Sequence, residues 1–380
     1  MTVTRAFRLL VALTLALGLS ACSYFSWLPW VGKKLPPLPE LSRNDASLAW
    51  SASVGKSAGY LFVPSVNDKL VYAASYDGTI AALAEDGGHS VARIDARARI
   101  SGGVGAADNF VAVASVKGEI LAFDAAGRSL WQATVGGEVL APPTVAAASV
   151  IIRTADGRIV SLNRADGKRR WVFQRAAPTL TLRTNAGVVV NRGTLYAGYP
   201  GGKMVAIEVE SGKPVWEASL SQPRGATELE RIADVSGLPV LDNSRVCAAV
   251  YQGRTGCLET LSGNVLWSRE IASSDSVAVD EKNLYVTESG GAIYALDKTT
   301  GSTVWKQDKL AQQEPGAPMI LKGRVVVGDS QGLVHVLSTE NGDLIGRVAT
   351  DGSRIVTLLS SADRAIAQTE RGGVFAIALK

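Results

Sequence analysis

The sequence predicts an all-β fold, an eight-bladed β-propeller that is closed by its N-terminal strand, and two observations carry this prediction. The first is an internal repeat: Gly-x-Ile-x-Ala-Leu, then a second Gly, then a Trp, recurs with a period near 40 residues. Such a period with short strands is typical of propeller blades built from four antiparallel strands. The second is that residues 50–55, near the N-terminus, read like the strand that the last repeat lacks.

Eight copies of the repeat follow one another, and their lead glycines are 40, 39, 45, 51, 38, 41 and 40 residues apart. Ala92 replaces the Trp in the first copy and Gly346 replaces it in the seventh, but the second Gly persists there as Gly88 and Gly342. The eight lead glycines are Gly78, Gly118, Gly157, Gly202, Gly253, Gly291, Gly332 and Gly372.

Each copy has the local signature of a β-hairpin. In the first copy, residues 70–74 and 80–83 are apolar strands, and Gly78 between them suits a turn that needs a positive φ. The eighth copy ends at Lys380 before its Trp strand, whereas residues 50–55 match residues 131–136 almost position by position. We therefore expect the N-terminal strand to complete the last blade, which removes a free sheet edge and makes residues 46–380 one domain. A parallel β-helix is the competing architecture, but its coils are usually shorter than this period.

The composition of the chain limits the classes of function that are possible. The 380 residues include 39 Lys and Arg against 35 Asp and Glu, a formal net charge of +4, which argues against a broad nucleic-acid footprint. Apolar residues make up 47% of the chain, enough for a large core. The chain has two histidines and three cysteines, which excludes a Cys-rich zinc module and makes a His-based metal site improbable.

Residues 1–21 have the pattern of a secretory leader. Arg5 and Arg8 precede an apolar run, residues 9–17, that is too short to span a membrane. The sequence Leu-Ser-Ala-Cys that ends at Cys22 resembles the bacterial lipobox, and Ser23 after it favours the outer membrane. We expect Cys22 to carry the lipid; an ordinary signal peptide with a nearby Cys is the alternative. Residues 22–45, with four prolines, are predicted to be a lipidated flexible tether.

Two neighbouring repeats are longer than the others, with intervals of 45 and 51 residues. The extra residues follow Trp171 and Trp216, so both loops should emerge on the same side of the ring. Loops carry function more often than scaffold strands do, which makes these two the candidates for a binding surface.

The content of the two loops indicates a protein-binding patch. The first carries Leu180, Leu182 and Arg183, and the second, residues 227–235, is acidic and includes Asp234. Thr227 and Glu230 in the second loop can form a capping box that opens a helical turn. The alternative is that the loops are merely longer, with the leucines filling the gap between blades and Arg183 paired with Asp234.

Cys247 and Cys257 flank the hairpin turn at Gly253. With a three-residue turn they would face each other and could form a disulfide, whereas with a two-residue turn they would point to opposite faces. An oxidising compartment permits the bond, and two buried apolar thiols are the alternative.

The repeat itself resembles that of the quinoprotein propellers, so three classes of function need weighing: a periplasmic quinoprotein-type dehydrogenase, a protein-interaction scaffold, and a polymer-binding propeller lipoprotein. The enzyme is disfavoured because most loops of the repeats are minimal and the repeats contain no paired-carboxylate, Ser/His/Asp or Cys/His constellation. His89 falls in a turn and His335 in a strand, as ordinary structural residues do. We therefore expect no catalytic residue, no cofactor and no metal.

A lipoprotein that consists of only such a propeller resembles the BamB family of the β-barrel assembly (Bam) machinery. The best matches are Leu180-Thr181-Leu182-Arg183, residues 226–235 and residues 325–332. The resemblance implies a non-catalytic, lipid-anchored outer-membrane protein that faces the periplasm. It also implies that the Leu-x-Leu-Arg loop and the acidic loop contact the POTRA domains of BamA, with unfolded outer-membrane proteins as further partners. The family's Asp-Val-Asp reads Asp234-Val235-Ser236 here, so Asp234 matches and Ser236 does not.

Overall fold

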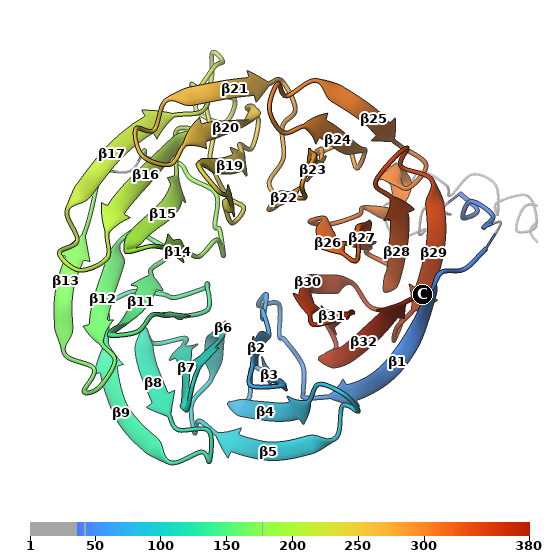
Figure 1. Cartoon of the computed structure of the whole chain (residues 1–380). Coiled ribbons are helices and arrows are strands. Elements are labelled where there is room, and N and C mark those ends of the chain that lie inside the picture. Colours follow the sequence, from blue (N-terminus) through green and yellow to red (C-terminus); the bar gives the residue numbers. More distant parts are fainter. Residues whose placement is uncertain (1–35, 42, 177) are drawn as a thin grey trace, which may run out of the picture. The chain divides into compact units, whose positions relative to one another are not determined.

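The computed structural model describes residues 36–41, 43–176 and 178–380, so Cys22 and the predicted leader lie outside the described residues. Residues 39–380 form one compact unit. Within this unit, eight four-stranded antiparallel sheets are arranged as blades around a central opening (Figure 1). The predicted eight-bladed propeller is therefore confirmed. In the described part of the chain, no helix is long and apolar enough to cross a membrane.

Every blade runs from an innermost strand beside the central opening to an outermost strand at the rim. In that order, blade 1 contains β2 (Ser65–Asn67), β3 (Leu70–Ala74), β4 (Thr79–Ala84) and β5 (Ser90–Asp95), and blade 2 contains β6 (Ile100–Ala107), β7 (Phe110–Ser115), β8 (Glu119–Phe123) and β9 (Ser129–Thr134). Blade 3 contains β10 (Thr144–Val145), β11 (Ser149–Arg153), β12 (Ile159–Asn163) and β13 (Arg169–Phe173), and blade 4 contains β14 (Val189–Asn191), β15 (Thr194–Tyr199), β16 (Lys203–Glu208) and β17 (Pro214–Ser219).

The second half of the ring repeats this order. Blade 5 contains β18 (Val240–Asp242), β19 (Arg245–Ala249), β20 (Thr255–Glu259) and β21 (Val265–Arg269), and blade 6 contains β22 (Ala278–Val279), β23 (Asn283–Thr287), β24 (Ile293–Asp297) and β25 (Thr303–Gln307). After a short 3-10 turn, η2 (Ala311–Gln313), blade 7 contains β26 (Met319–Leu321), β27 (Arg324–Gly328), β28 (Leu333–Ser338) and β29 (Leu344–Ala349). Blade 8 contains β30 (Ile355–Ser361), β31 (Arg364–Thr369), β32 (Gly373–Leu379) and, outermost, β1 (Ala46–Ser53).

The two ends of the chain close the ring, as the sequence predicts. Strand β1 pairs antiparallel with β32, and Trp50 lies opposite Ala376. The core continues across this junction, because Trp50 and Val54 of blade 8 share a buried apolar cluster with Val71 and Leu83 of blade 1. The N-terminal strand therefore occupies the edge that the last repeat would otherwise leave open.

The Gly and Trp of the repeat form the contact between neighbouring blades. Trp50 Nε1 donates to the carbonyl oxygen of Glu85 at 2.8 Å, and its ring covers Gly88, where a Cβ atom would lie 2.4 Å from Trp50 Cε3. Five more Trp–Gly pairs repeat this packing: Trp131 with Gly167, Trp171 with Gly212, Trp216 with Gly263, Trp267 with Gly301, and Trp305 with Gly342. The Trp and the second Gly therefore recur with the blade period because the Trp of each blade must pack against the Gly of the next blade.

Residues just before β1 lie against the outer edge of blade 7. Asp45 N donates to the carbonyl oxygen of Ile345 at 2.9 Å, and Arg347 donates to the carbonyl oxygen of Pro39 at 3.0 Å. The Asn44 side chain accepts from Arg347 N and donates to Arg347 O. Pro39, Asn44 and Asp45, near the end of the segment predicted as a tether, thus contact the outer edge of blade 7.

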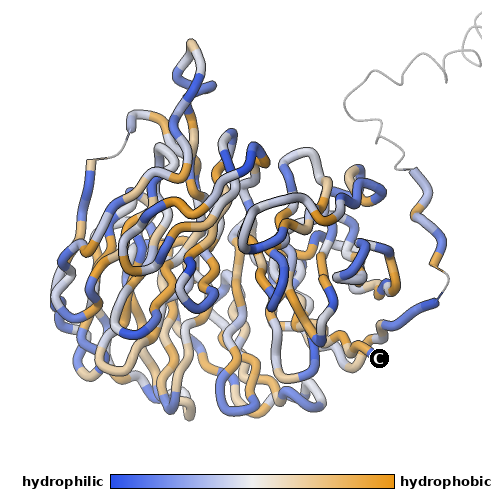
Figure 2. Tube along the Cα trace, turned by 45° about the horizontal axis from the view of Figure 1, so that its top comes forward, coloured by the Kyte–Doolittle hydropathy of each residue, from blue (hydrophilic) through white to orange (hydrophobic). Residues whose placement is uncertain are grey.

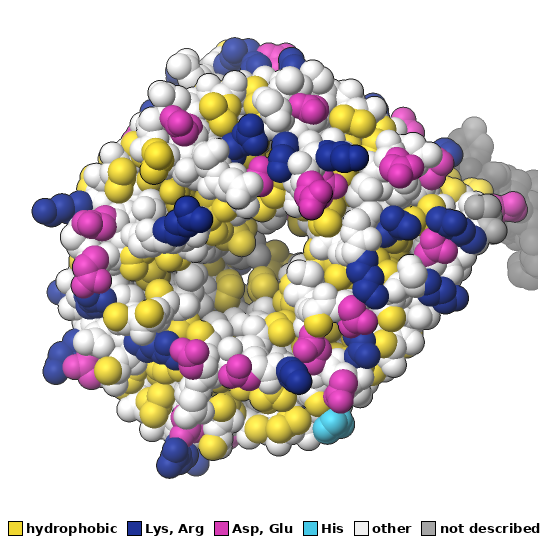
Figure 3. All heavy atoms as spheres, viewed as in Figure 1, with side chains coloured by type: hydrophobic (Ala, Val, Ile, Leu, Met, Phe, Trp, Pro, Cys, Tyr) yellow, Lys and Arg dark blue, Asp and Glu magenta, His cyan; other side chains and the backbone are white. Residues whose placement is uncertain are grey.

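Charged side chains are mixed over the face of the ring seen in Figure 3. Lys and Arg alternate there with Asp and Glu around the central opening, without a broad field of one sign. This distribution agrees with the small net charge of +4 over the whole chain.

Candidate protein-binding surface

The two lengthened loops lie side by side on one face of the ring, as predicted. The first connects β13 to β14 and the second connects β17 to β18. Leu182 N donates to Asp234 Oδ2 at 2.7 Å, and Thr184 Oγ1 donates to the carbonyl oxygen of Ser236 at 2.6 Å. The two loops therefore form one surface that spans blades 3 to 5.

The first loop exposes apolar and basic side chains. Leu180 is 42% exposed, Leu182 is half-buried and Arg183 is exposed. The exposure of Leu180 speaks against the alternative that this leucine fills the gap between blades. Exposed apolar side chains on such a loop are typical of a surface that binds another protein.

The Asp234 side chain is buried and binds backbone groups of the protein itself. The residue is 3% exposed, and its carboxylate accepts from Leu182 N and, at 3.3 Å, from Gly201 N. Burial raises the pKa of Asp234, although the two backbone donors and the charge of Arg153 oppose the shift. The carboxylate thus fixes the Leu180–Arg183 loop in place, and it does not pair with Arg183.

Arg183 instead pairs with Glu138, which lies between β9 and β10. Arg183 Nη2 donates to Glu138 Oε1 at 2.6 Å and Nε donates to Oε2 at 3.4 Å, and the guanidinium stands 5.7 Å from the ring centre of Tyr60. Hydrogen bonding to Glu138 raises the pKa of Arg183 further above its usual value. Sequence reasoning missed Glu138, yet a signal existed. The partners are 45 residues apart, close to one repeat, and Arg354 pairs in the same way with a Glu 40 residues away.

A buried arginine supports the surface from behind. Arg153, at the end of β11, is 5% exposed, donates to the carbonyl oxygen of Gly187 at 3.5 Å and lies 5.0 Å from the ring centre of Tyr199. Burial lowers the pKa of Arg153, and the proximity of Tyr199 and Asp234 opposes that shift. The signal in the sequence is an arginine that ends the apolar strand Ser149–Arg153.

The second loop rises above this face. Residues 222–231 are all exposed, and this is the yellow-green loop at the top of Figure 1 that stands clear of the ring in Figure 2. The predicted capping box is present: Thr227 N donates to Glu230 Oε2 at 3.1 Å, and Glu230 N donates to Thr227 Oγ1 at 3.3 Å. The loop forms one turn and not a longer helix.

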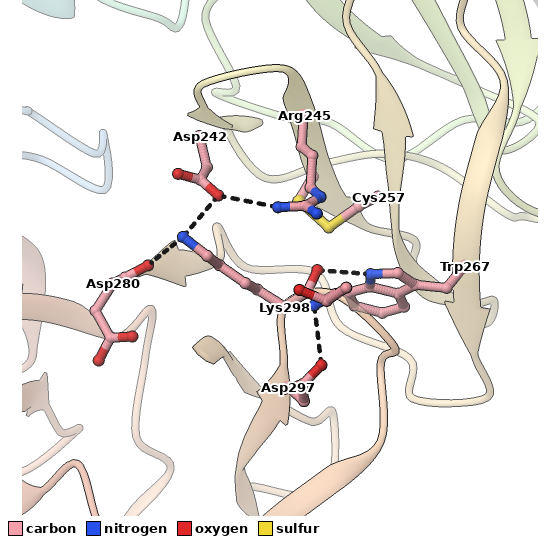
Figure 4. The surroundings of a disulfide bond; sticks show 9 residues. Asp242, Arg245, Cys257, Trp267, Asp280, Asp297 and Lys298 are labelled. Atoms are coloured by element: carbon pink, nitrogen blue, oxygen red, sulfur yellow. Dashed lines mark hydrogen bonds and ion pairs between the residues drawn. A yellow bond between two sulfur atoms is a disulfide. The ribbon is translucent and has the colours of Figure 1, made fainter. Parts of the chain in front are cut away.

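Cys247 in β19 and Cys257 in β20 are joined by a disulfide in the structure, with Cα atoms 4.0 Å apart. Five residues, 250–254, connect the two strands, and an odd number places the two side chains on the same face. Trp267 lies opposite Cys257 on the next strand, and Lys298 crosses from blade 6 to Asp242 beside them at 2.9 Å (Figure 4). The bond holds the hairpin whose tip supports the second loop, since Tyr251 N donates to the carbonyl oxygen of Asp234 at 2.8 Å.

The comparisons with known proteins agree with the propeller fold. The profile of the family described as outer membrane protein assembly factor BamB matches residues 76–307 and 290–380. This chain belongs to that family. The BamB of Nitrosomonas eutropha is 40% identical over 333 residues, which cover 87% of this chain and 81% of the relative. The BamB of Escherichia coli (strain K12) is 32% identical over 375 residues, covering 94% and 95%.

Solved structures show the same fold. The crystal structure of BamB from Moraxella catarrhalis superposes with a TM-score of 0.81 and 23% identity, over 88% of this chain and 100% of that chain. A quinohemoprotein alcohol dehydrogenase from Comamonas testosteroni superposes with a TM-score of 0.70 and 13% identity, over 88% of this chain and 76% of that chain. Both likenesses concern the fold alone, and the enzyme's chemistry does not follow from its propeller.

His335 has structural partners. It is fully buried, its Nε2 lies 2.9 Å from Asp329 Oδ2, and its Nδ1 is 3.3 Å from Arg347 Nε. Among the described residues, no group of three or more His, Cys, Asp and Glu side chains is arranged to hold a metal ion.

Proposed function

We propose that this protein is a non-catalytic scaffold subunit of the outer-membrane β-barrel assembly machinery, and that it binds the POTRA domains of BamA through Leu180, Leu182 and Arg183. The observation that carries the proposal is that these three residues share one loop, which Asp234 of the adjacent loop holds in place. Membership of the BamB family supports the same role.

Each residue has a distinct part in the proposed contact. Full burial of a leucine side chain contributes about 1.5–3 kcal/mol, and Leu180, with 42% of its surface still exposed, would contribute less than half of that, about 0.6–1.3 kcal/mol. Arg183 binds Glu138 through Nε and Nη2, and this ion pair would orient the exposed guanidinium for the partner. Asp234 is a positioning residue, because its carboxylate meets the backbone of Leu182 and not the solvent.

The proposal extends to the location of the protein. A lipid on Cys22, which lies outside the described residues, would anchor the propeller to the outer membrane on its periplasmic side. Unfolded outer-membrane proteins are further proposed partners. Cys22→Ala should leave unprocessed precursor or soluble protein, and mass spectrometry that finds a mature N-terminus elsewhere without an acyl adduct would refute the anchor.

The test of the binding surface is a double variant, Leu180→Ala with Leu182→Ala, in the full-length lipoprotein. We expect co-purification of BamA to fall, because buried apolar anchors dominate interfaces. The melting temperature should change little, because exposed loop substitutions usually cost less than about 0.5 kcal/mol. Leu261→Ala is the matched control, since Leu261 is 83% exposed in the turn between β20 and β21. A destabilised double variant that still retains BamA would contradict the proposal.

A further inference from the structure

The junction between blade 7 and blade 8 is built differently from the six junctions that contain a Trp–Gly pair. Gly346 stands where the repeat would place the Trp of blade 7. Blade 8 takes its outermost strand, β1, from the N-terminal part of the chain, so it has no turn with a second Gly to receive a Trp. Ala46 lies against this position instead: a Cβ atom at Gly346 would be 3.1 Å from Ala46 Cβ, and Ala46 belongs to a buried apolar cluster of both blades.

The residues that precede β1 connect the same two blades. We call residues 39–41 and 43–45 the strap. Asp45 N donates to the carbonyl oxygen of Ile345 in β29 at 2.9 Å, and the carbonyl oxygen of Asp45 accepts from Lys380 N, directly after β32, at 2.9 Å. One residue of the strap thus bonds to the outermost strand of blade 7 and to the backbone of blade 8.

Arg347 of β29 binds the other end of the strap. Its Nη2 donates to the carbonyl oxygen of Pro39 at 3.0 Å, and its backbone N–H and C=O bond to the Asn44 side chain at 2.9 and 3.0 Å. The guanidinium is itself held from inside the blade, because Nε donates to Nδ1 of the fully buried His335 at 3.3 Å. Since an arginine can only donate, His335 carries its proton on Nε2 and donates it to Asp329 Oδ2 at 2.9 Å.

We propose that the strap closes the junction between blades 7 and 8 in place of the Trp–Gly contact, and that Arg347 is the positioning residue that holds it there. A side chain whose orientation is fixed before it binds loses little entropy in the contact. The buried pair of His335 and Asp329 gives Arg347 that orientation, so it strengthens the contact of Arg347 with the strap.

The strap also sets the point at which the N-terminal segment leaves the propeller. That point is Pro39 on blade 7, whereas the Leu180–Arg183 loop follows β13 of blade 3, on the opposite side of the ring (Figure 1). This step rests on the proposed lipid at Cys22. Pro39 is 17 residues after Cys22, a reach of at most about 60 Å, whereas Ala46 is 24 residues after it, a reach of about 85 Å. The bound strap therefore keeps the propeller closer to its anchor and the tether away from the proposed partner loop.

The test measures release of the strap in the full-length lipoprotein, solubilised in detergent. Arg347→Met removes the donors of the guanidinium and keeps an apolar stem. It should speed hydrogen exchange at the Asp45 amide about tenfold, the equivalent of about 1.4 kcal/mol, because that amide is protected only while the strap lies on β29. Trypsin cleavage after Arg43, inside the strap, should rise by a similar factor, because cleavage follows the population of the released form.

Two further variants make the result specific. Arg269→Met is the matched control, because Arg269 lies in the outermost strand β21 and also donates to two backbone carbonyl oxygens of the next blade, without touching the strap. It should change neither rate at the strap. Asn44→Ala acts from the side of the strap, since Asn44 is exposed and outside the blades, and it should also speed exchange at Asp45 even if Arg347→Met does not fold.

The proposal is overturned if Asn44→Ala and Arg347→Met both exchange at Asp45 like Arg269→Met. It is also overturned if Arg347→Met lowers the melting temperature while exchange at Asp45 and cleavage after Arg43 stay at the parent rates, because Arg347 then stabilises blade 7 alone. Neither result bears on the proposed function, which the Leu180/Leu182 double variant and Cys22→Ala test separately.

Discussion

Substituting Gly301 by Ala tests whether the repeat glycine exists to receive the tryptophan of the preceding blade. Gly301 has φ +71, and a Cβ atom there would lie 2.4 Å from Trp267 Cε3, in a contact that real Cβ atoms do not make. Trp267 cannot move away freely, because its Nε1 donates to the carbonyl oxygen of Lys298 at 2.9 Å (Figure 4). The substitution therefore destabilises the protein in two ways, through backbone strain at a positive φ and through a steric clash with the Trp267 ring.

The magnitude follows from these two costs. A left-handed backbone costs an alanine about 1–2 kcal/mol, and overpacking a well-filled contact costs about 1–3 kcal/mol. Gly301→Ala should therefore lose about 2–5 kcal/mol. Gly323→Ala is the matched control, because Gly323 has φ +66 and a Cβ atom there would meet no heavy atom within 4 Å. The control should lose only the backbone cost, about 1–2 kcal/mol.

Thermal unfolding measures the difference, at roughly 2 °C per kcal/mol for a domain of this size. A Trp267→Leu background completes the cycle, since the smaller side chain removes the clash and should make Gly301→Ala cost no more than the control. The reasoning is refuted if Gly301→Ala and Gly323→Ala melt together in the parent protein.

Three further predictions concern single groups. Asp234→Ala should leave Leu182 N without an acceptor, cost about 1–3 kcal/mol, and speed hydrogen exchange at that amide; unchanged exchange would contradict its positioning role. Burial raises the pKa of Asp275 from 3.8 to about 6, with Arg354 opposing the shift. Ionisation of this carboxyl is thus costly in the folded state, so Asp275→Asn should raise the melting temperature at pH 7.5, and the gain should shrink as the pH falls through 6 and become small near pH 4. Denatured, unreduced protein should show no free thiol from Cys247 and Cys257, and two free thiols would exclude the disulfide.

The propeller could be predicted from the sequence because the repeat contains both residues, the Trp and the Gly, that form the contact between neighbouring blades. Gly and Trp recur with the blade period since one must fit the other across each junction, and the match of residues 50–55 to residues 131–136 follows from the same rule. The length of two repeats also indicated where the proposed binding surface lies, because both extra segments follow an outer strand and must emerge on one face. These features depend on spacing, which a linear sequence displays directly.

Which polar side chains pair with one another depends on the direction in which each side chain points, and residue spacing alone does not give that direction. An aspartate in an exposed-looking loop predicts a surface charge, yet the fold turns Asp234 inward to the backbone of a loop 52 residues away. Likewise, the sequence offers Asp234 as a partner for Arg183, whereas in the folded protein Arg183 pairs with Glu138. Opposite charges about one repeat apart form a rule by which such pairs could be found in other propellers of this kind.

The inward direction of Asp234, at the end of the acidic loop, also bears on the role of Ser236. The resemblance to the family implies an aspartate at this position, and its absence would weaken the proposed interface if the loop offered charge to the partner. Ser236 is buried, however, and its carbonyl oxygen accepts from Thr184 Oγ1 while its own Oγ donates to the carbonyl oxygen of Ser274 at 2.9 Å. The position therefore helps to hold the first loop in register with the second, and a serine meets that need through its backbone and hydroxyl. On this account, Ser236→Asp should add little affinity for BamA at any salt concentration, whereas a gain that disappears at high salt would show that the loop presents its charge outward.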